Sequence, residues 1–245
     1  MVEFDIKKLL LAQTLERLRD MRDAADQVLE CHRILNVTDD NIVGELIKNE
    51  EIFYEWSHYP EGDVYDAVSH SQYYYHAHPA DERANEHGHF HVFMRPKGMP
   101  EGIRPAPIPE YEAPDDPDDN LSHLAAISMD SAGLPIRLFA TNRWVTGEVW
   151  YAGEDVCRML DRFIIDHAQP SWPVNLWISG MVRLFDPQIR MLIAARDAAI
   201  QARRRSHPDV NIFEDRDFEV IAECAIDIRT QLAAVEAELN RRGAG

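Results

Sequence analysis

Histidine is concentrated in one stretch of this 245-residue chain, where seven of the eleven histidines lie between His58 and His91. The centre of the stretch reads YYYHAHP over residues 73–79 and EHGHFHVF over residues 86–93. Histidines two apart in a β-strand share a face, so the alternation predicts two strands that each carry a histidine pair. Neutral imidazole is a common ligand for transition metals, so this feature constrains both the fold and the chemistry.

The two strands are expected to form an antiparallel hairpin with a definite pairing. We expect His78 opposite His89 and His76 opposite His91. This pairing gathers four imidazoles on one face and leaves aromatic and apolar side chains on the other. Opposed residues place their Cβ atoms roughly 4.5–5.5 Å apart, which lets the rings converge on one metal ion. A slip of one residue would bury the histidines in the core, so the pattern selects the face.

Further residues close to the hairpin are candidates for the same site. The expected metal ligands are all histidines in or beside these strands, namely His76, His78, His87, His89, His91 and His123. Metal-bound histidine commonly donates its second N–H to a carboxylate. The expected catalytic residues are Glu86, Arg143 and Glu148. The last two belong to the segment 142–148, which joins two predicted strands and can line a substrate pocket.

The order of elements predicts an α+β fold, with an antiparallel sheet that carries the histidine-rich hairpin between N-terminal and C-terminal helices. A single domain over residues 1–245 is expected, helical over 1–50, β-rich over 53–151 and helical over 154–241. The predicted strands are Tyr73–His78, His89–Met94, His123–Met129, Pro135–Thr141 and Gly147–Tyr151. The predicted helices cover about 9–31, 40–49, 155–167, 174–185, 186–205 and 214–241. Proline and acidic residues over 96–120 indicate a solvated loop.

Composition excludes several classes of function. The net charge is −18, from 25 basic and 43 acidic residues, which disfavours nucleic acid and anionic membranes as partners. Three widely spaced cysteines give neither a disulfide framework nor a zinc ribbon. Dinucleotide, P-loop and nucleophile-elbow motifs are absent. With no signal peptide and no long apolar run, a cytoplasmic protein is expected.

Two resemblances follow from these motifs. His76, His78 and Glu82 match the H-x-H-x3-E core of the cupin metal motif, which implies iron, manganese, zinc or copper on a hairpin. The chain lacks the preceding glycine and the second cupin motif, so the likeness concerns the metal chemistry and not the fold. Residues 56–95 and 141–150 also resemble a bacterial family known as a domain of unknown function. That family shares the tyrosine run, HAHP and EHGHFH, and it implies a defined domain without an assigned activity.

The sequence therefore predicts a metal-dependent enzyme with a histidine-ligated transition metal. Iron is the first expectation and copper or zinc the next, because an all-histidine set does not suit magnesium or calcium. An oxidoreductase acting on a small molecule is favoured. A zinc hydrolase with Glu86 as base, a non-enzymatic metal carrier and a structural metal clamp are the alternatives. The sequence leaves a homodimer open.

Overall fold

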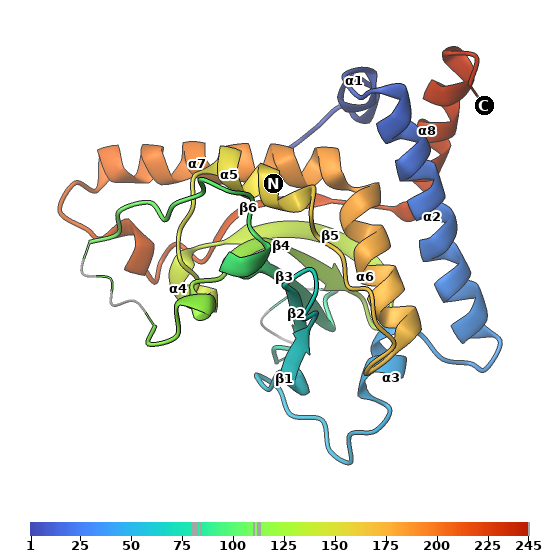
Figure 1. Ribbon diagram of the computed structural model, residues 1–245, viewed down its shortest axis with the longest axis horizontal. Helices are drawn as coiled ribbons and strands as arrows, with labels where there is room; N and C mark the ends of the chain where they lie inside the picture. The colour runs from blue at the N-terminus through green and yellow to red at the C-terminus, as the bar shows by residue number, and fades with distance from the viewer. Residues whose placement is uncertain (80–82, 84, 110, 112–113, 245) are drawn as a thin grey trace.

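The fold was analysed in a computed structural model that describes residues 1–79, 83, 85–109, 111 and 114–244. Within these residues, six strands form one sheet in the order β1-β2-β3-β4-β5-β6, and every neighbouring pair is antiparallel (Figure 1). The strands are β1 Tyr59–Tyr65, β2 Ser71–His76, β3 Gly88–Met94, β4 Ser122–Met129, β5 Pro135–Thr141 and β6 Val220–Ala225. The sheet therefore follows the chain order without a crossover.

Helices flank the sheet at both ends of the chain, which confirms the predicted α+β class. They are α1 Ile6–Leu11, α2 Leu15–Asn36, α3 Ile42–Ile47, α4 Arg143–Thr146, α5 Gly153–Leu160, α6 Trp172–Leu184, α7 Asp186–Ser206 and α8 Ile228–Arg241. Side-chain caps fix several starts: Thr14 caps α2, Ser171 caps α6 and Asp227 caps α8. Each cap oxygen satisfies a backbone N–H that has no partner within its helix.

One face of the sheet packs against the helices. The Phe90 ring of β3 lies 5.4 Å from the Trp177 ring of α6, measured between ring centres, and the Tyr73 hydroxyl donates to Asn175 Oδ1 at 2.6 Å. Figure 1 shows α6 and α7 lying along this side of the sheet. Tyr73 and Phe90 share this face because Phe90 pairs directly with Tyr75, which lies two residues from Tyr73 on the same side of β2. The histidines therefore face away from the helical layer.

The hairpin pairing differs from the predicted one by two residues. His76 lies opposite His89, and Tyr74 lies opposite His91. The predicted pairs of His78 with His89 and His76 with His91 are therefore wrong, whereas the predicted face is correct. A local packing constraint accompanies this register: a Cβ on Gly88 would lie 2.5 Å from the backbone oxygen of His76. Only glycine permits that approach.

Two predicted elements are wrong, two predicted helices have other bounds and two strands were missed. The helix predicted over 9–31 is divided between α1 and α2, and the one predicted over 155–167 ends at Leu160. Gly147–Tyr151 is not a strand; Gly147 ends α4 at φ +68°, and the residues after it make isolated backbone bonds instead of a ladder. Residues 214–241 are not one helix, because β6 pairs with β5 and a new helix begins only after Asp227. Edge pairing to the sheet overrides local helix propensity there. The unpredicted strands, β1 and β6, form the two edges of the sheet.

The proline-rich acidic segment is tied down at its C-terminal end. Arg95 donates to the backbone oxygen of Asp118 at 3.2 Å and forms an ion pair with Asp119. Short 3-10 turns at Pro96–Gly98 and Pro117–Asp119 flank the segment. The expectation of a wholly solvated loop is wrong at this end. Glu82 of the cupin-like match lies outside the described residues.

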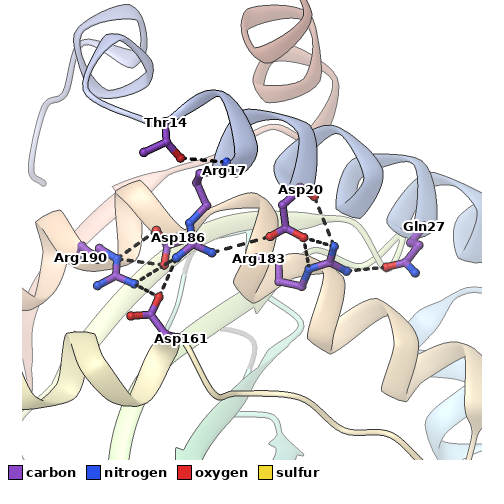
Figure 2. Close-up of polar contacts among 8 residues, drawn as sticks. All are labelled: Thr14, Arg17, Asp20, Gln27, Asp161, Arg183, Asp186 and Arg190. Atoms are coloured by element: carbon purple, nitrogen blue, oxygen red, sulfur yellow. Dashed lines mark hydrogen bonds and ion pairs between the residues drawn. The ribbon is translucent and has the colours of Figure 1, made fainter. Parts of the chain in front are cut away.

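The helical layer holds its own buried polar cluster, which we call the ion-pair network (Figure 2). Asp186, at the start of α7, is buried and accepts hydrogen bonds from Arg190 at 3.0 Å and from Arg17 of α2 at 3.5 Å. Both arginines also bind Asp161, at 2.6 and 2.7 Å. Arg183 of α6 links Asp20 and Gln27 of α2 in the same network. These bonds fasten the N-terminal helix to the C-terminal helices.

Among the described residues, no helix is both long enough and apolar enough to cross a membrane.

Candidate metal centre

Three histidines converge on the face of the sheet that points away from the helices. His76 comes from β2, and His89 and His91 come from β3. Their ring centres form a triangle with sides of 4.5, 4.7 and 5.2 Å. One nitrogen from each ring lies within 4.8 Å of the others, and all three residues are buried. Three imidazoles at this spacing can hold one metal ion, and we call them the histidine triad.

Hydrogen bonds select which nitrogen two of the rings present. His89 Nδ1 lies 2.7 Å from Glu86 Oε1, and since a carboxylate only accepts, this nitrogen carries the proton. His91 Nδ1 lies 3.0 Å from Nε2 of His123, the next ring outward. His89 and His91 therefore each turn Nε2 toward the centre of the triad, where His89 Nε2 lies 2.8 Å from His76 Nε2. An outer carboxylate that fixes the tautomer, as Glu86 does for His89, is a usual companion of a metal-bound histidine.

Burial keeps the triad uncharged. Loss of water lowers the pKa of His76 to about 2 and that of His89 to about 4, and it takes the pKa of His91 well below its ordinary value. The neighbouring imidazoles add to the effect for His76 and His91, whereas Glu86 opposes it for His89. Neutral imidazole is the form that binds metal, so the triad needs to release no proton at neutral pH.

The Glu86 carboxylate stays ionised beside these rings. Its side chain is only 1% exposed, and it forms an ion pair with Arg137 besides its contact with His89. Burial raises the pKa of Glu86, but hydrogen bonds from His89 and Ser128 and the charge of Arg83 outweigh it and lower the value to about 2. Glu86 is therefore an anion that holds the His89 ring in place.

Two buried ring nitrogens of the triad have no hydrogen-bond partner among the described residues: His91 Nε2 and His76 Nδ1. A buried polar atom without a partner costs about 1–3 kcal/mol of stability. The rest of the described chain satisfies most of its buried polar side-chain atoms. Orphaned nitrogens in a neutral three-imidazole set fit a metal ion, which supplies the missing bonds.

A cavity of about 430 Å³ adjoins the triad at His76. Aromatic side chains form much of its wall, together with one ion pair between Arg83 and Glu219. The lining residues are Trp56, His58, Tyr74, His76, His78, Arg83, Trp144, Val145 and Glu219. His89 and His91 lie deeper and do not line it. The cavity therefore reaches a metal ion held by the triad from one side only, past His76.

The family of the chain follows from its comparison with known proteins. A family model described as a domain of unknown function (DUF6969) matches residues 22–226, which include the triad and the whole sheet. The chain belongs to the DUF6969 family. No curated protein and no solved structure matches it. Membership confirms the resemblance to an uncharacterised family and leaves the geometry of the site as the guide to function.

The other predicted ligands of this DUF6969 chain lie at three different places. The His78 ring lies 5.0 Å from the His76 ring and 5.2 Å from the His89 ring, at the cavity wall but outside the triad. His123 stands behind His91 and does not reach the triad centre. His87 is exposed on the opposite face, where its Nδ1 lies 2.6 Å from the Tyr75 hydroxyl.

The predicted catalytic residues of segment 142–148 do not line the cavity beside the triad. Arg143 forms an ion pair with Glu214 and stacks on Tyr111. Glu148 is buried and accepts a hydrogen bond from the backbone N–H of His123 at 2.7 Å. Burial raises the pKa of Glu148 to about 8, although Arg196 and that hydrogen bond oppose the shift. From this segment, Trp144 and Val145 reach the cavity instead.

Sequence reasoning singled out part of the cavity wall, namely the histidines and the segment 142–148, which contributes Trp144 and Val145. Trp56 and Arg83 belong to connecting segments that no periodic pattern marks. His58 carried a signal, since it belongs to the histidine-rich stretch, but its partner Asp63 did not. His58 and Asp63 come together because of the bulge in the edge strand β1.

Proposed function

We propose that this protein is a metal-dependent enzyme whose histidine triad holds a transition metal ion. One observation carries the proposal: three buried neutral imidazoles converge beside a cavity that is large enough for a small molecule. Three protein ligands with an accessible further position are the pattern of catalytic sites, whereas structural sites are closed by four. The cavity supports catalysis over simple storage, because a carrier needs no organised pocket.

Redox chemistry with iron or copper is the first candidate. A bound iron or copper ion would supply electron transfer or oxygen activation at this position. The chain supports such chemistry by keeping the triad dry, since Phe139 packs 5.0 Å from the His89 ring and Tyr74 packs 5.1 Å from the His91 ring. A low-dielectric surrounding of this kind controls the redox potential of a metal site. The substrate is then a small molecule that enters past His76.

Zinc-dependent hydrolysis is the second candidate, because the three-imidazole ligand set is also that of catalytic zinc. In this case Glu86 is a poor base: its carboxylate is fully engaged by His89 and Arg137 and does not line the cavity. We assign Glu86 to positioning of His89 instead. Arg143 and Glu148 keep supporting roles behind the cavity wall.

A cytoplasmic location belongs to the same proposal. Cys31, Cys157 and Cys224 are free thiols, as is usual in a reducing compartment.

Metal analysis of untagged protein, followed by its electronic spectrum in air, tests the proposal. We expect about one equivalent of metal, with charge-transfer bands from iron or copper that azide or nitric oxide changes. Colourless protein with one equivalent of zinc would move the assignment to hydrolysis. Absence of stoichiometric metal after loading with iron, copper and zinc in turn would overturn the proposal.

A further inference from the structure

A histidine–aspartate pair, His58 with Asp63, lies beside the triad, and its histidine lines the cavity. His58 Nδ1 lies 3.0 Å from Asp63 Oδ1, and the His58 ring lies flat on Tyr74, with ring centres 3.6 Å apart and planes 9° apart. The centre of the His58 ring is 5.9 Å from that of His76. His58 therefore lines the same cavity as His76 without belonging to the triad, and Asp63 lies behind His58, outside the cavity lining.

The Asp63 carboxylate is held from both sides. Its Oδ2 accepts from Gln72 Nε2 at 2.6 Å, and Gln72 Oε1 in turn accepts from Arg95 Nε at 2.6 Å. Asp63 lies in a bulge of β1, with φ +60°, a conformation that costs energy for a residue other than glycine. The hydrogen-bonded series Arg95–Gln72–Asp63–His58 thus fixes the orientation of the His58 imidazole.

This series determines what His58 offers to the cavity. An ionised carboxylate only accepts, so His58 Nδ1 carries a proton, and in the neutral imidazole Nε2 keeps its lone pair. No other described residue hydrogen-bonds His58 Nε2. His58 therefore presents an oriented hydrogen-bond acceptor, which selects a ligand that has an O–H or N–H group.

Two indoles supply the other half of the recognition surface. Trp144 and Trp56 both line the cavity. Trp56 is 55% exposed and has φ +69°, which is a strained conformation for a bulky residue. Its indole meets the His78 ring edge-on, with ring centres 4.2 Å apart. A large apolar ring kept in solvent by a strained backbone is suited to pack against an incoming flat molecule.

We propose that the cavity binds a small hydroxyl-bearing aromatic molecule, whose ring packs against Trp56 and Trp144 and whose hydroxyl donates to His58 Nε2. This inference deepens the proposed function by naming a substrate class for the same cavity. It assigns His58 as a binding residue and Asp63 as a positioning residue.

Three matched probes separate the two halves of the recognition. Phenol has the ring and the donor, anisole has the ring without the donor, and cyclohexanol has the donor without the aromatic ring. Calorimetric or NMR titration gives a dissociation constant for each probe. We expect phenol to bind about fivefold more tightly than anisole, the ratio that one net hydrogen bond of about 1 kcal/mol gives. We expect a similar preference for phenol over cyclohexanol.

Asp63→Asn is the most specific variant. Gln72 Nε2 still needs an acceptor at its side of residue 63, so the amide oxygen faces Gln72 and the amide NH2 faces His58. The His58 proton then moves to Nε2, which turns the acceptor into a donor. We expect the preference to disappear, because the oxygen of either probe can accept from Nε2–H. His58→Phe keeps the stack on Tyr74 and should equalise the two probes.

Trp56→Leu should remove the preference for phenol over cyclohexanol, whereas Trp172→Leu, an exposed tryptophan outside the cavity, should not. Equal binding of phenol and anisole to the unaltered protein, or an unchanged preference in Asp63→Asn, would overturn the inference.

Running every titration on full-length protein before and after chelator treatment separates this inference from the proposed function. Probe discrimination that persists in protein that never binds metal would retain the aromatic site and discard the metal enzyme. Metal binding without probe discrimination would do the reverse. Circular dichroism of each variant confirms that the comparison concerns folded protein.

Discussion

The ion-pair network of the helical layer and the histidine triad of the sheet are both buried and polar, but they are satisfied in different ways. In the network, Asp186 accepts from Arg17 and Arg190, and both arginines have a second acceptor in Asp161 (Figure 2). In the triad, His91 Nε2 and His76 Nδ1 have no partner within the described chain. A cluster that completes its own hydrogen bonds stabilises the fold, whereas an incomplete one has capacity for a ligand.

Removing two members of the triad should have the largest effect. His89→Ala with His91→Ala deletes both β3 ligands of the triad and leaves only His76, so we expect metal affinity to fall by more than about 1,000-fold. Elemental analysis after dialysis measures this. His207→Ala, at the end of α7, should retain full metal. Stoichiometric metal in the double variant would show that the triad is not the binding site.

Glu148 is intermediate between the two clusters, because its buried carboxylate has a backbone donor but forms no ion pair with any residue that the structure describes. Its folded-state pKa of about 8 exceeds the unfolded value of 4.5, so the folded protein binds this proton more tightly. Its contribution to stability is full below pH 4.5 and declines as the pH rises to 8. The loss should amount to a few kcal/mol.

Denaturant unfolding of wild type and Glu148→Gln at pH 5 and pH 8 measures this contribution. The glutamine variant should lose less stability between the two pH values, because its amide does not ionise. Parallel pH dependences in the two proteins would contradict the raised pKa.

Breaking the ion-pair network should destabilise the protein without touching metal. Asp186→Asn leaves Arg17 and Arg190 short of a charged partner and should lower the free energy of unfolding by about 2 kcal/mol, less than for a fully buried pair. The two arginine side chains are 27% and 30% exposed, which permits some hydration. Urea titration gives the loss, and the metal content should equal that of wild type. A drop in metal content would mean that the two clusters are coupled.

Changing Glu86, the outer partner of His89, should weaken metal binding, in contrast to the loss of stability expected for Asp186→Asn. Glu86→Gln removes the anion that fixes the His89 tautomer, so we expect about 10- to 100-fold weaker metal binding. Competition with a chromophoric chelator measures the affinity. Glu214→Gln, which alters a carboxylate paired with Arg143 away from the triad, is the matched control. Equal affinities in the two variants would deny Glu86 a positioning role.

The smallest effect is expected at the rim of the network. Asp20 pairs with Arg183, and both side chains are about one-third exposed. Exposed ion pairs contribute about 0–1 kcal/mol, so Asp20→Asn should change the unfolding free energy by less than about 1 kcal/mol. A loss as large as that of Asp186→Asn would mean that the network acts as one cooperative unit.

The histidine face could be predicted from the sequence, but the pairing of the hairpin could not. A shift of two residues keeps every side chain on its own face, so the alternation cannot distinguish His76 opposite His89 from His76 opposite His91. The close approach at Gly88 depends on backbone geometry that side-chain patterns do not encode. The alternation of histidines was therefore enough to predict that several rings converge on one face. The pairing register was also needed to tell which three of them form the triad.

The edge strands and the arrangement of the cavity wall escaped prediction for a different reason. β6 has too short a pattern to separate from the helix that follows it, and β1 contains Pro60 and Gly62, which weaken any strand signal. Trp56 comes from a connecting segment and Trp144 from the short helix α4, far apart in the chain. Contacts of that kind depend on tertiary packing, which no local periodicity records.

The bulge in β1 has a consequence for how the sheet meets other chains. An edge strand offers a row of free backbone groups on which a second molecule can add a strand and begin aggregation. In β1 the ladder is interrupted between Tyr59 and Val64, and Pro60 lacks an N–H, so this edge is a poor template. At the opposite edge, the Val2 N–H already binds the Glu223 oxygen of β6. The irregularity that places Asp63 beside His58 thus also protects the open side of the sheet from self-association.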